Sequence, residues 1–213
     1  MPFIIDGRRG GRIVAAVITA LALSATPAMA YQTTAPTVST APGCTTPTTQ
    51  AFLFTNDRSD YVPAPGGNVE GSLAGWSLTG GAAAVAGSAP AVTGAGVGTK
   101  SLLIPNGGSV TSAPMCVGAH SPYFRFQARN AAGAGVLKVE VLYLDGPRYT
   151  GEREVGYVTA GSAWAPTRRQ SLSQGIMGVN GSSTGQATIA FRFTPVGGTW
   201  QVDDLYVDPF RRY

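Results

Sequence analysis

Residues 123–129 have the sequence YFRFQAR, in which apolar and polar side chains alternate along the chain. The apolar positions are Phe124, Phe126 and Ala128, and the polar positions are Arg125, Gln127 and Arg129. Successive side chains of a strand point to opposite faces, so the two sets would lie on opposite sides of a sheet. This period is typical of a strand with one face in the core. The segment therefore predicts a half-buried β-strand.

Two further segments alternate in the same way, LKVEVLYLD at residues 137–145 and QATIAFRFT at residues 186–194. Less regular segments that we also expect to be strands are residues 51–54, 102–104, 154–159 and 200–207. No window of a dozen residues has helical periodicity, and the 29 glycines and 15 prolines favour short strands joined by turns. We therefore predict an all-β fold, a jelly-roll β-sandwich of two antiparallel sheets.

The N-terminus predicts a secretion signal that is cleaved after Ala30. Arg8, Arg9 and Arg12 form a cationic start, an apolar run follows from Ile13 to Ala25, and Ala28-Met29-Ala30 has the small residues of a cleavage site. The apolar run is shorter than the roughly 20 residues that a membrane-spanning helix needs. We expect a secreted protein, extracellular or at the cell surface, with no stable membrane anchor after cleavage.

The rest of the chain divides into a leader and one domain. Residues 31–50 are rich in Thr and Pro and carry no charge, so they cannot bury enough apolar surface to fold alone. We expect them to form an extended leader. Residues 51–213 are enough for one core and too few for two comfortable domains, so they predict a single β-sandwich domain.

The charge of the exported chain argues against nucleic acid as a partner. The formal net charge is +4, and the signal contributes +2 of it through its arginines and Asp6, which leaves +2. A nucleic-acid-binding domain is expected to carry a basic patch or stripe, and none is visible here.

Cys44 and Cys116 are the only two cysteines. Exported chains enter a compartment in which thiols oxidise, so we predict that the two form a disulfide. Such a bridge would stabilise the fold by roughly 4 kcal/mol in the chain-entropy model. The alternative is a pair of free, buried thiols.

The sequence carries no complete catalytic motif. The single histidine, His120, lies in a turn-rich stretch and no G-x-S-x-G motif is present, so we do not expect a serine or cysteine hydrolase. Glu152 and Glu154 would share one face of a strand at roughly the carboxylate spacing of an inverting glycosidase. Neighbouring charged residues make a solvated strand edge the preferred interpretation. We therefore expect no enzymatic activity.

Polar strand positions and aromatic residues suggest a binding surface instead. Arg125, Gln127 and Arg129, with Arg192 on a second strand and Lys138 and Glu140 on a third, predict one polar sheet face that holds hydroxyls or acidic groups. A solvated, salt-bridged face is the alternative. Aromatic rings suited to stacking on sugars are found at Tyr123, Tyr143, Tyr149, Tyr157, Trp164 and Tyr206.

Three short motifs resemble those of the jelly-roll carbohydrate-binding modules of bacterial exported enzymes, also called galactose-binding-domain-like. They are GNVE at 67–70 followed by Gly75-Trp76, GTKSL at 98–102, and WQVDDLYV at 200–207. The resemblance implies neighbouring first and last strands joined by a structural calcium, with Glu70 and either Asp203 or Asp204 as its oxygen ligands. Hydrogen bonding between the terminal strands is the alternative role for these acids.

Two functions follow as hypotheses. The first is a non-catalytic exported module that binds a polysaccharide or cell-wall glycan, through the face of Arg125, Gln127 and Arg129 or through aromatics near Tyr149 and Trp164. The second is a structural cell-surface protein that associates with copies of itself, which the low charged fraction of 12% favours.

Overall fold

The computed structural model describes residues 47–118, 123–145, 148–172 and 186–208, and only the backbone of residues 118, 145, 148–153 and 186. All of these residues belong to one compact unit, Thr33–Tyr213. The predicted signal, Cys44 and His120 lie outside the described residues.

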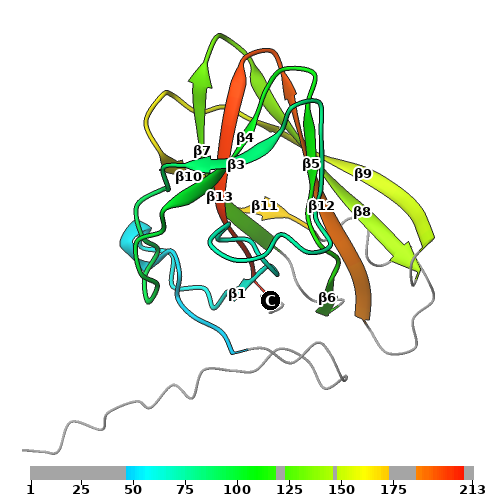
Figure 1. The fold of residues 1–213 in the computed structure, drawn as a ribbon. Coiled ribbons are helices and arrows are strands. Elements are labelled where there is room, and N and C mark those ends of the chain that lie inside the picture. The colour runs from blue at the N-terminus through cyan, green and yellow to red at the C-terminus, as the bar shows by residue number, and fades with distance from the viewer. Residues whose placement is uncertain (1–46, 119–122, 146–147, 173–185, 209–213) are drawn as a thin grey trace, which may run out of the picture. The chain divides into compact units, whose positions relative to one another are not determined.

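Two antiparallel sheets form a sandwich, with the first sheet on the left and the second on the right of Figure 1. The first has seven strands in the order β10-β7-β13-β4-β3, with β1 on β13 and β11 on β7. Its strands are β1 (Val62–Pro63), β3 (Ala83–Ala86), β4 (Lys100–Ile104), β7 (Tyr123–Ala132), β10 (Ala165–Pro166), β11 (Gln170–Ser171) and β13 (Thr199–Asp208).

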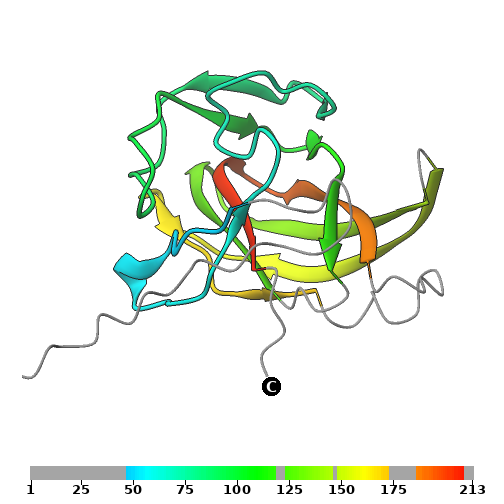
Figure 2. The ribbon, with the colours of Figure 1, turned by 90° about the horizontal axis from the view of Figure 1, so that it is seen from below.

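The second sheet has six strands in the order β2-β5-β12-β8-β9, with β6 on β12. Its strands are β2 (Ser77–Thr79), β5 (Ser109–Thr111), β6 (Met115–Gly118), β8 (Val136–Asp145), β9 (Arg148–Val158) and β12 (Gln186–Val196). Figure 2 shows the same strands from below. The prediction of an all-β sandwich of two antiparallel sheets is confirmed.

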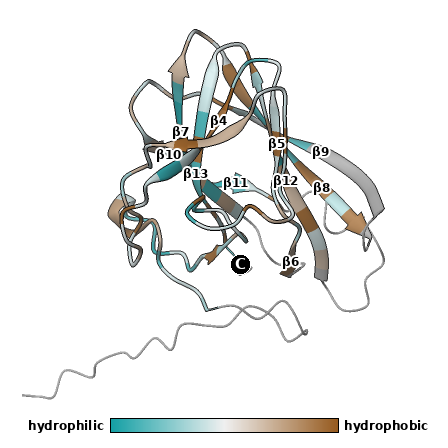
Figure 3. Ribbon diagram, viewed as in Figure 1, coloured by the Kyte–Doolittle hydropathy of each residue, from teal (hydrophilic) through white to brown (hydrophobic). Residues whose placement is uncertain are grey.

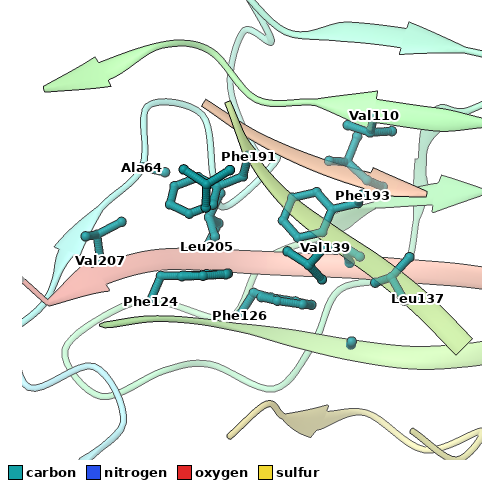
Figure 4. Close-up of a cluster of buried hydrophobic side chains, with 14 of the residues drawn as sticks. Ala64, Val110, Phe124, Phe126, Leu137, Val139, Phe191, Phe193, Leu205 and Val207 are labelled. Atoms are coloured by element: carbon teal, nitrogen blue, oxygen red, sulfur yellow. The ribbon is translucent and has the colours of Figure 1, made fainter. Parts of the chain in front are cut away.

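The core lies between the sheets and is built from the apolar positions of the alternating strands (Figures 3 and 4). Phe124 and Phe126 of β7 meet Phe191 and Phe193 of β12, with ring centroids 4.6 Å apart for Phe124–Phe191 and 4.9 Å for Phe126–Phe193. All four rings are fully buried. Each such side chain stabilises the fold by about 1.5–3 kcal/mol through burial. Period 2 therefore decides which side of each strand enters the core.

The predicted strands at 123–129, 137–145 and 186–194 are confirmed as β7, β8 and β12, and those at 102–104, 154–159 and 200–207 overlap β4, β9 and β13. The strand predicted at 51–54 is wrong, because residues Leu53–Thr55 form a short 3-10 helix, η1. Phe52 is fully buried there, whereas Leu53 and Phe54 are 39% and 54% exposed. Only one ring of this apolar run is needed for packing, so the run need not be extended.

A second, smaller apolar cluster covers part of the outer face of the first sheet. It consists of Ala51, Phe52, Tyr61, Val92 and Tyr206. The Phe52 ring packs edge-on against Tyr61 at 5.1 Å and against Tyr206 at 5.9 Å. The segment that enters the domain therefore shields one end of this face from solvent.

β13 contains an extra residue opposite β7. Asp203 pairs with Gln127 and Tyr206 pairs with Arg125, so the register shifts between them. Asp204 has the left-handed φ of 51°, which a non-glycine residue adopts rarely. The bulge brings Asp203 and Tyr206 to the same outer face although they are three positions apart, an offset that places residues of a regular strand on opposite faces.

Cys116 lies in β6 and is not a free thiol. Cys44 is not described, so its pairing with Cys116 stays a prediction. In the parts of the chain that the structure describes, no helix has the length and apolarity needed to cross a membrane.

Candidate functional site

The outer face of the second sheet carries a row of polar residues across four neighbouring strands. Arg192 of β12 pairs with Thr111 of β5 on one side and with Glu140 of β8 on the other, and Glu140 pairs with Glu154 of β9. Phe191 and Phe193 point into the core, so Arg192 between them points outward. The row follows directly from the strand register.

A second row lies beside the first. Lys138 of β8 pairs with Thr194 of β12 and with Tyr157 of β9. The Tyr157 side chain is 53% exposed, which makes it one of the few large aromatic residues open to solvent. The rows place Lys138, Glu140, Glu154, Tyr157 and Arg192 on three adjacent strands, and we call these five residues the β8 cluster.

Two ion pairs and a hydrogen bond connect the β8 cluster. Lys138 Nζ lies 2.8 Å from Glu140 Oε1, Arg192 Nε lies 3.9 Å from Glu140 Oε2, and Tyr157 Oη donates to Glu154 Oε2 at 3.1 Å. The hydrogen bond to Glu140 raises the pKa of Lys138, and that to Glu154 raises the pKa of Tyr157. Two cations and two carboxylates leave the cluster without net charge.

Glu140 holds one oxygen without a hydrogen bond. Its side chain is only 5% exposed, and among the described residues Oε2 has no hydrogen-bond partner. A buried acceptor left unpaired costs about 1–3 kcal/mol. A hydroxyl donor that displaced the side chains covering this oxygen would remove that cost. The cluster thus combines a buried acceptor without a hydrogen bond, two cationic donors and an open aromatic ring.

The structure places the predicted binding residues of β7 elsewhere. β7 belongs to the first sheet, and β8 and β12 belong to the second, so the prediction of one polar face shared by Arg125, Gln127, Arg129 and Arg192 is wrong. Period 2 separates inward from outward positions but does not assign a strand to a sheet. The polar sides of the two sheets face away from each other across the core.

Arg125 is a buried structural residue. Its Nε donates to Thr167 O at 2.8 Å, and its Nη1 donates to Asp57 Oδ2 at 2.9 Å and to Thr55 Oγ1 at 3.0 Å. The guanidinium also lies 4.4 Å from the centroid of the Phe52 ring. These contacts fasten the entering segment to β7 and leave little of Arg125 for a ligand.

Gln127 is buried as well, with 1% of its surface exposed. Its Nε2 donates to Pro90 O at 2.6 Å and to Asp204 Oδ2 at 2.9 Å. Arg129 and Trp164, by contrast, are half-buried and lie together at the other end of β7, with Arg129 Cζ 5.2 Å from the Trp164 ring centroid. The Tyr149 side chain lies outside the described residues.

The other candidate stacking rings differ in exposure. Tyr143 and Tyr206 are 3% and 6% exposed and therefore belong to the two apolar clusters. Tyr123 is half-buried beneath the guanidinium of Arg169, whose Cζ lies 5.4 Å from the ring centroid. Trp164 is likewise half-buried with a guanidinium over its ring, so among the predicted platforms whose side chains are described only Tyr157 is exposed.

The three predicted calcium ligands bind protein donors. Glu70 accepts hydrogen bonds from Thr99 N at 2.6 Å, Lys100 N at 2.7 Å and Thr99 Oγ1 at 2.8 Å. These bonds lower its pKa. Asp203 accepts from Ser88 Oγ at 2.9 Å and Ala89 N at 3.0 Å. The acids thus tie the loop that contains Ser88 and Thr99 to the rest of the domain.

Asp203 and Asp204 have no cation beside them in the described structure. Burial, with the neighbouring Asp204 adding to it, raises the pKa of Asp203 to about 7. Burial likewise raises the pKa of Asp204, to which the charge of Glu70 contributes. Within the described residues, no group of three or more His, Cys, Asp or Glu could hold a metal ion. Calcium binding by Glu70 and Asp203 or Asp204 therefore stays a prediction from the resemblance.

Comparison with family models and with curated proteins gives no match. Among solved structures, 27 chains match, and they include carbohydrate-binding modules, the kind of protein that the sequence motifs resemble. The chain is similar to the enzymatically active domain of tailspike protein 4 of bacteriophage CBA120, with 14% identity and a TM-score of 0.44 over 68% of this chain and 21% of that one.

It is also similar to the CBM22-1 xylan-binding domain of Paenibacillus barcinonensis Xyn10C, with 15% identity, a TM-score of 0.44, and 68% and 91% of the two chains covered. A third similar structure is TmCBM61 in complex with β-1,4-galactotriose, with 18% identity, a TM-score of 0.38, and 68% and 94% covered. Likeness at this level does not identify a ligand, so we infer the ligand from the chain's own residues.

Proposed function

We propose that this chain is a non-catalytic, exported binding module that holds a polysaccharide or cell-wall glycan on the outer face of the second sheet. The observation that carries the proposal is Glu140 Oε2, a buried acceptor with no hydrogen-bond partner among the described residues, in the same cluster as the open ring of Tyr157. Sugar hydroxyls donate to carboxylates, and the apolar faces of sugar rings stack on aromatic rings.

The charges of the β8 cluster favour a hydroxylated ligand over a polyanion at this face. Lys138 and Arg192 are both within 4 Å of Glu140, so each cation already faces a carboxylate. A strongly anionic ligand would have to compete with Glu140 and Glu154. Hydroxyl groups can instead accept from the cations and donate to the carboxylates at the same time.

Retention on insoluble polysaccharides, combined with a glycan array, tests the proposal on the chain from residue 31. We expect binding to at least one glycan and at least a tenfold loss in Glu140→Ala and in Tyr157→Ala, because a lost charged hydrogen bond or stacking contact costs roughly 1.5–3 kcal/mol. Phe54→Ala is the matched aromatic control, since Phe54 is 54% exposed and lies outside the cluster. Asp60→Asn controls for loss of a carboxylate.

A folded chain that no glycan retains would overturn this proposal. A different outcome would be the release of reducing sugar from a bound glycan. If Glu154→Gln abolished that release, the result would support a hydrolase that uses Glu152 and Glu154. Glu154 is exposed and bonded to Tyr157, while the side chain of Glu152 is not described. Assaying every bound glycan for hydrolysis separates a binding module from an enzyme.

Self-association remains the second candidate because β9 ends the second sheet. This strand runs from Arg148 to Val158, and the sheet order gives it one neighbour, β8. An unpaired edge can add a strand from another copy, although charged residues such as those of β9 oppose that pairing. Size exclusion with light scattering decides the question, since a strict monomer at high concentration excludes this role.

A further inference from the structure

The outer face of the first sheet has an open end that the entering segment does not cover. Phe52 and its cluster lie over the end with Arg125, whereas Arg129 and Trp164 at the other end are only half-buried. Arg129 points outward because Phe126 and Ala128, on the alternate positions of β7, lie in the core. This second polar area is on the opposite side of the sandwich from the β8 cluster.

A chain of hydrogen bonds fixes the guanidinium of Arg129. Its Nε donates to Gln201 Oε1 at 2.6 Å, and Gln201 Nε2 donates to Ser101 Oγ at 3.2 Å. Ser101 Oγ in turn donates to Gly87 O at 2.6 Å. Because the amide of Gln201 is held at both ends, its oxygen must face Arg129. The orientation of the guanidinium is therefore set before any ligand arrives.

Backbone pairing places Trp164 beside Arg129. Ala165 of β10 pairs with Ala128 of β7, and Asn130 N donates to Gly161 O at 2.9 Å. These contacts bind the chain to β7 both before and after Trp164 in the sequence. The Arg129 Cζ distance of 5.2 Å from the ring centroid is within the roughly 6 Å range of a cation–π contact. The ring thus supports the guanidinium from one side.

The terminal nitrogens of Arg129 have no partner among the described residues. Arg125 and Arg169 lie beside Asp57, and Arg192 lies beside Glu140, but no described carboxylate is within 4.0 Å of Arg129. Arg58 and Arg168 also lack an ion pair, but both are exposed and nothing holds their guanidinium groups. Arg129 is a fixed, half-buried cation whose two outer amino groups remain free.

We propose that Arg129 and Trp164 form a second binding site, which takes an oxyanion carried by a saccharide, either the carboxylate of a uronic acid or a sulfate ester. A guanidinium with two free amino groups donates to two oxygens of such a group at once. The oxyanion follows from Arg129 itself, while its attachment to a saccharide rests on the proposed function. One molecule would then contact glycan on both faces of the sandwich.

Affinity electrophoresis of the chain from residue 31 tests this site with three probes: polygalacturonate for carboxylates, dextran sulfate for sulfate esters, and unsubstituted dextran as the neutral reference. We expect retardation by at least one polyanion. Arg129→Gln should weaken it about tenfold or more, and Arg129→Lys nearly as much, because lysine keeps the charge but loses the two-pronged donor. Trp164→Ala should weaken it less. Unchanged melting temperatures will show that the variants are folded.

Arg168→Gln is the matched control, since it removes the same charge from an exposed arginine that nothing holds in place. Equal losses in Arg129→Gln and Arg168→Gln would overturn the proposal, because they would show attraction by net charge alone. So would a wild-type chain that neither polyanion retards. Tyr157→Ala, which removes no charge, should weaken glycan retention at the β8 cluster, whereas Arg129→Gln should weaken polyanion binding, so failure of the β8 cluster and failure of this site give different results.

Discussion

The outer faces of the two sheets both carry charged residues at alternate strand positions, but those under the entering segment on the first sheet are buried, whereas the cations of the second lie near the surface. On the first sheet, Phe52 and its neighbours cover Arg125, which then bonds to Asp57, Thr55 and Thr167. On the second sheet, Arg192 and Lys138 stay near the surface beside Glu140. A covering segment obliges every charge beneath it to find a partner in the protein, whereas an uncovered face can leave groups for a ligand.

Two carboxylates beside the outer face of the first sheet, Asp57 and Asp203, show what such partners do. Burial by itself would raise the pKa of Asp57, but hydrogen bonds from Ser59, Tyr61 and Arg125 hold that pKa well below its usual range. Asp203 has no cation beside it, and burial raises its pKa to about 7. Hydrogen-bond donors and a neighbouring cation therefore stabilise the ionised form of Asp57, whereas burial without a cation disfavours that of Asp203.

The largest effect is expected from removing the covered cation. Arg125→Met should lower the free energy of unfolding by about 3–5 kcal/mol, because it leaves Asp57 and the Thr167 carbonyl without their buried donor. Denaturant unfolding measures the change. Arg168→Met, an exposed control, should change it by no more than about 0.5 kcal/mol. If the two variants were equally stable, the entering segment would not depend on Arg125.

A pH titration of stability should separate Asp203 from Asp57. The folded pKa of Asp203, about 7, lies above its ordinary value of 3.8, so the unfolded state ionises more readily. Stability should fall as the pH rises from about 4 to 7, by up to about 4 kcal/mol in a chelating buffer. Asp203→Asn should abolish this loss. Repeating the titration with millimolar calcium tests the predicted calcium site, because a bound cation would remove the loss.

The acid side of the same titration should report Asp57. Its folded pKa is depressed, so its contribution is present above the unfolded pKa of about 3.9 and is lost as the pH falls toward the folded value. Asp57→Asn should therefore remove stability at neutral pH and flatten the acid limb below about pH 4. An acid limb identical in wild type and Asp57→Asn would show that other carboxylates dominate it.

The smallest effect on stability is expected on the uncovered face. Tyr157→Ala should change the free energy of unfolding by about 0.5 kcal/mol or less, because the ring is half exposed and contacts little of the core. The same variant should lose glycan retention. Measuring both quantities on one preparation tells a binding residue from a structural one, since a structural residue would lose both together.

Much of this fold was predictable from residue alternation, because β7, β8 and β12 bury every second side chain. The assignment of strands to sheets was not, since register depends on pairing between distant segments. For this reason Arg125 and Arg192 were predicted on one face and lie on different sheets. Lys138 and Glu140 were visible as outward positions, but their partners Glu154 and Tyr157 follow from the β8–β9 register, which contains a bulge.

The burial of Arg125 and Gln127 also had no local signal. Both occupy outward positions of a regular strand, and only the chain segments near Phe52 and Pro90 enclose them. Isolated polar positions on a strand are thus ambiguous until the path of the loops is known. Arg129 also occupies an outward position of β7. It stays half-buried because no described apolar cluster covers its end of the strand.

The extra residue of β13 marks a place where this strand could lose a residue without exchanging its two faces. Removing Asp204 would restore strict alternation after Asp203, with Leu205 and Val207 still facing the core. Tyr206 would still face outward beside Phe52, but Gln127 would lose the carboxylate that accepts its hydrogen bond. Among relatives of this chain, a deletion at this point should therefore be accompanied by a change at Gln127, even where the segment around Phe52 is the same.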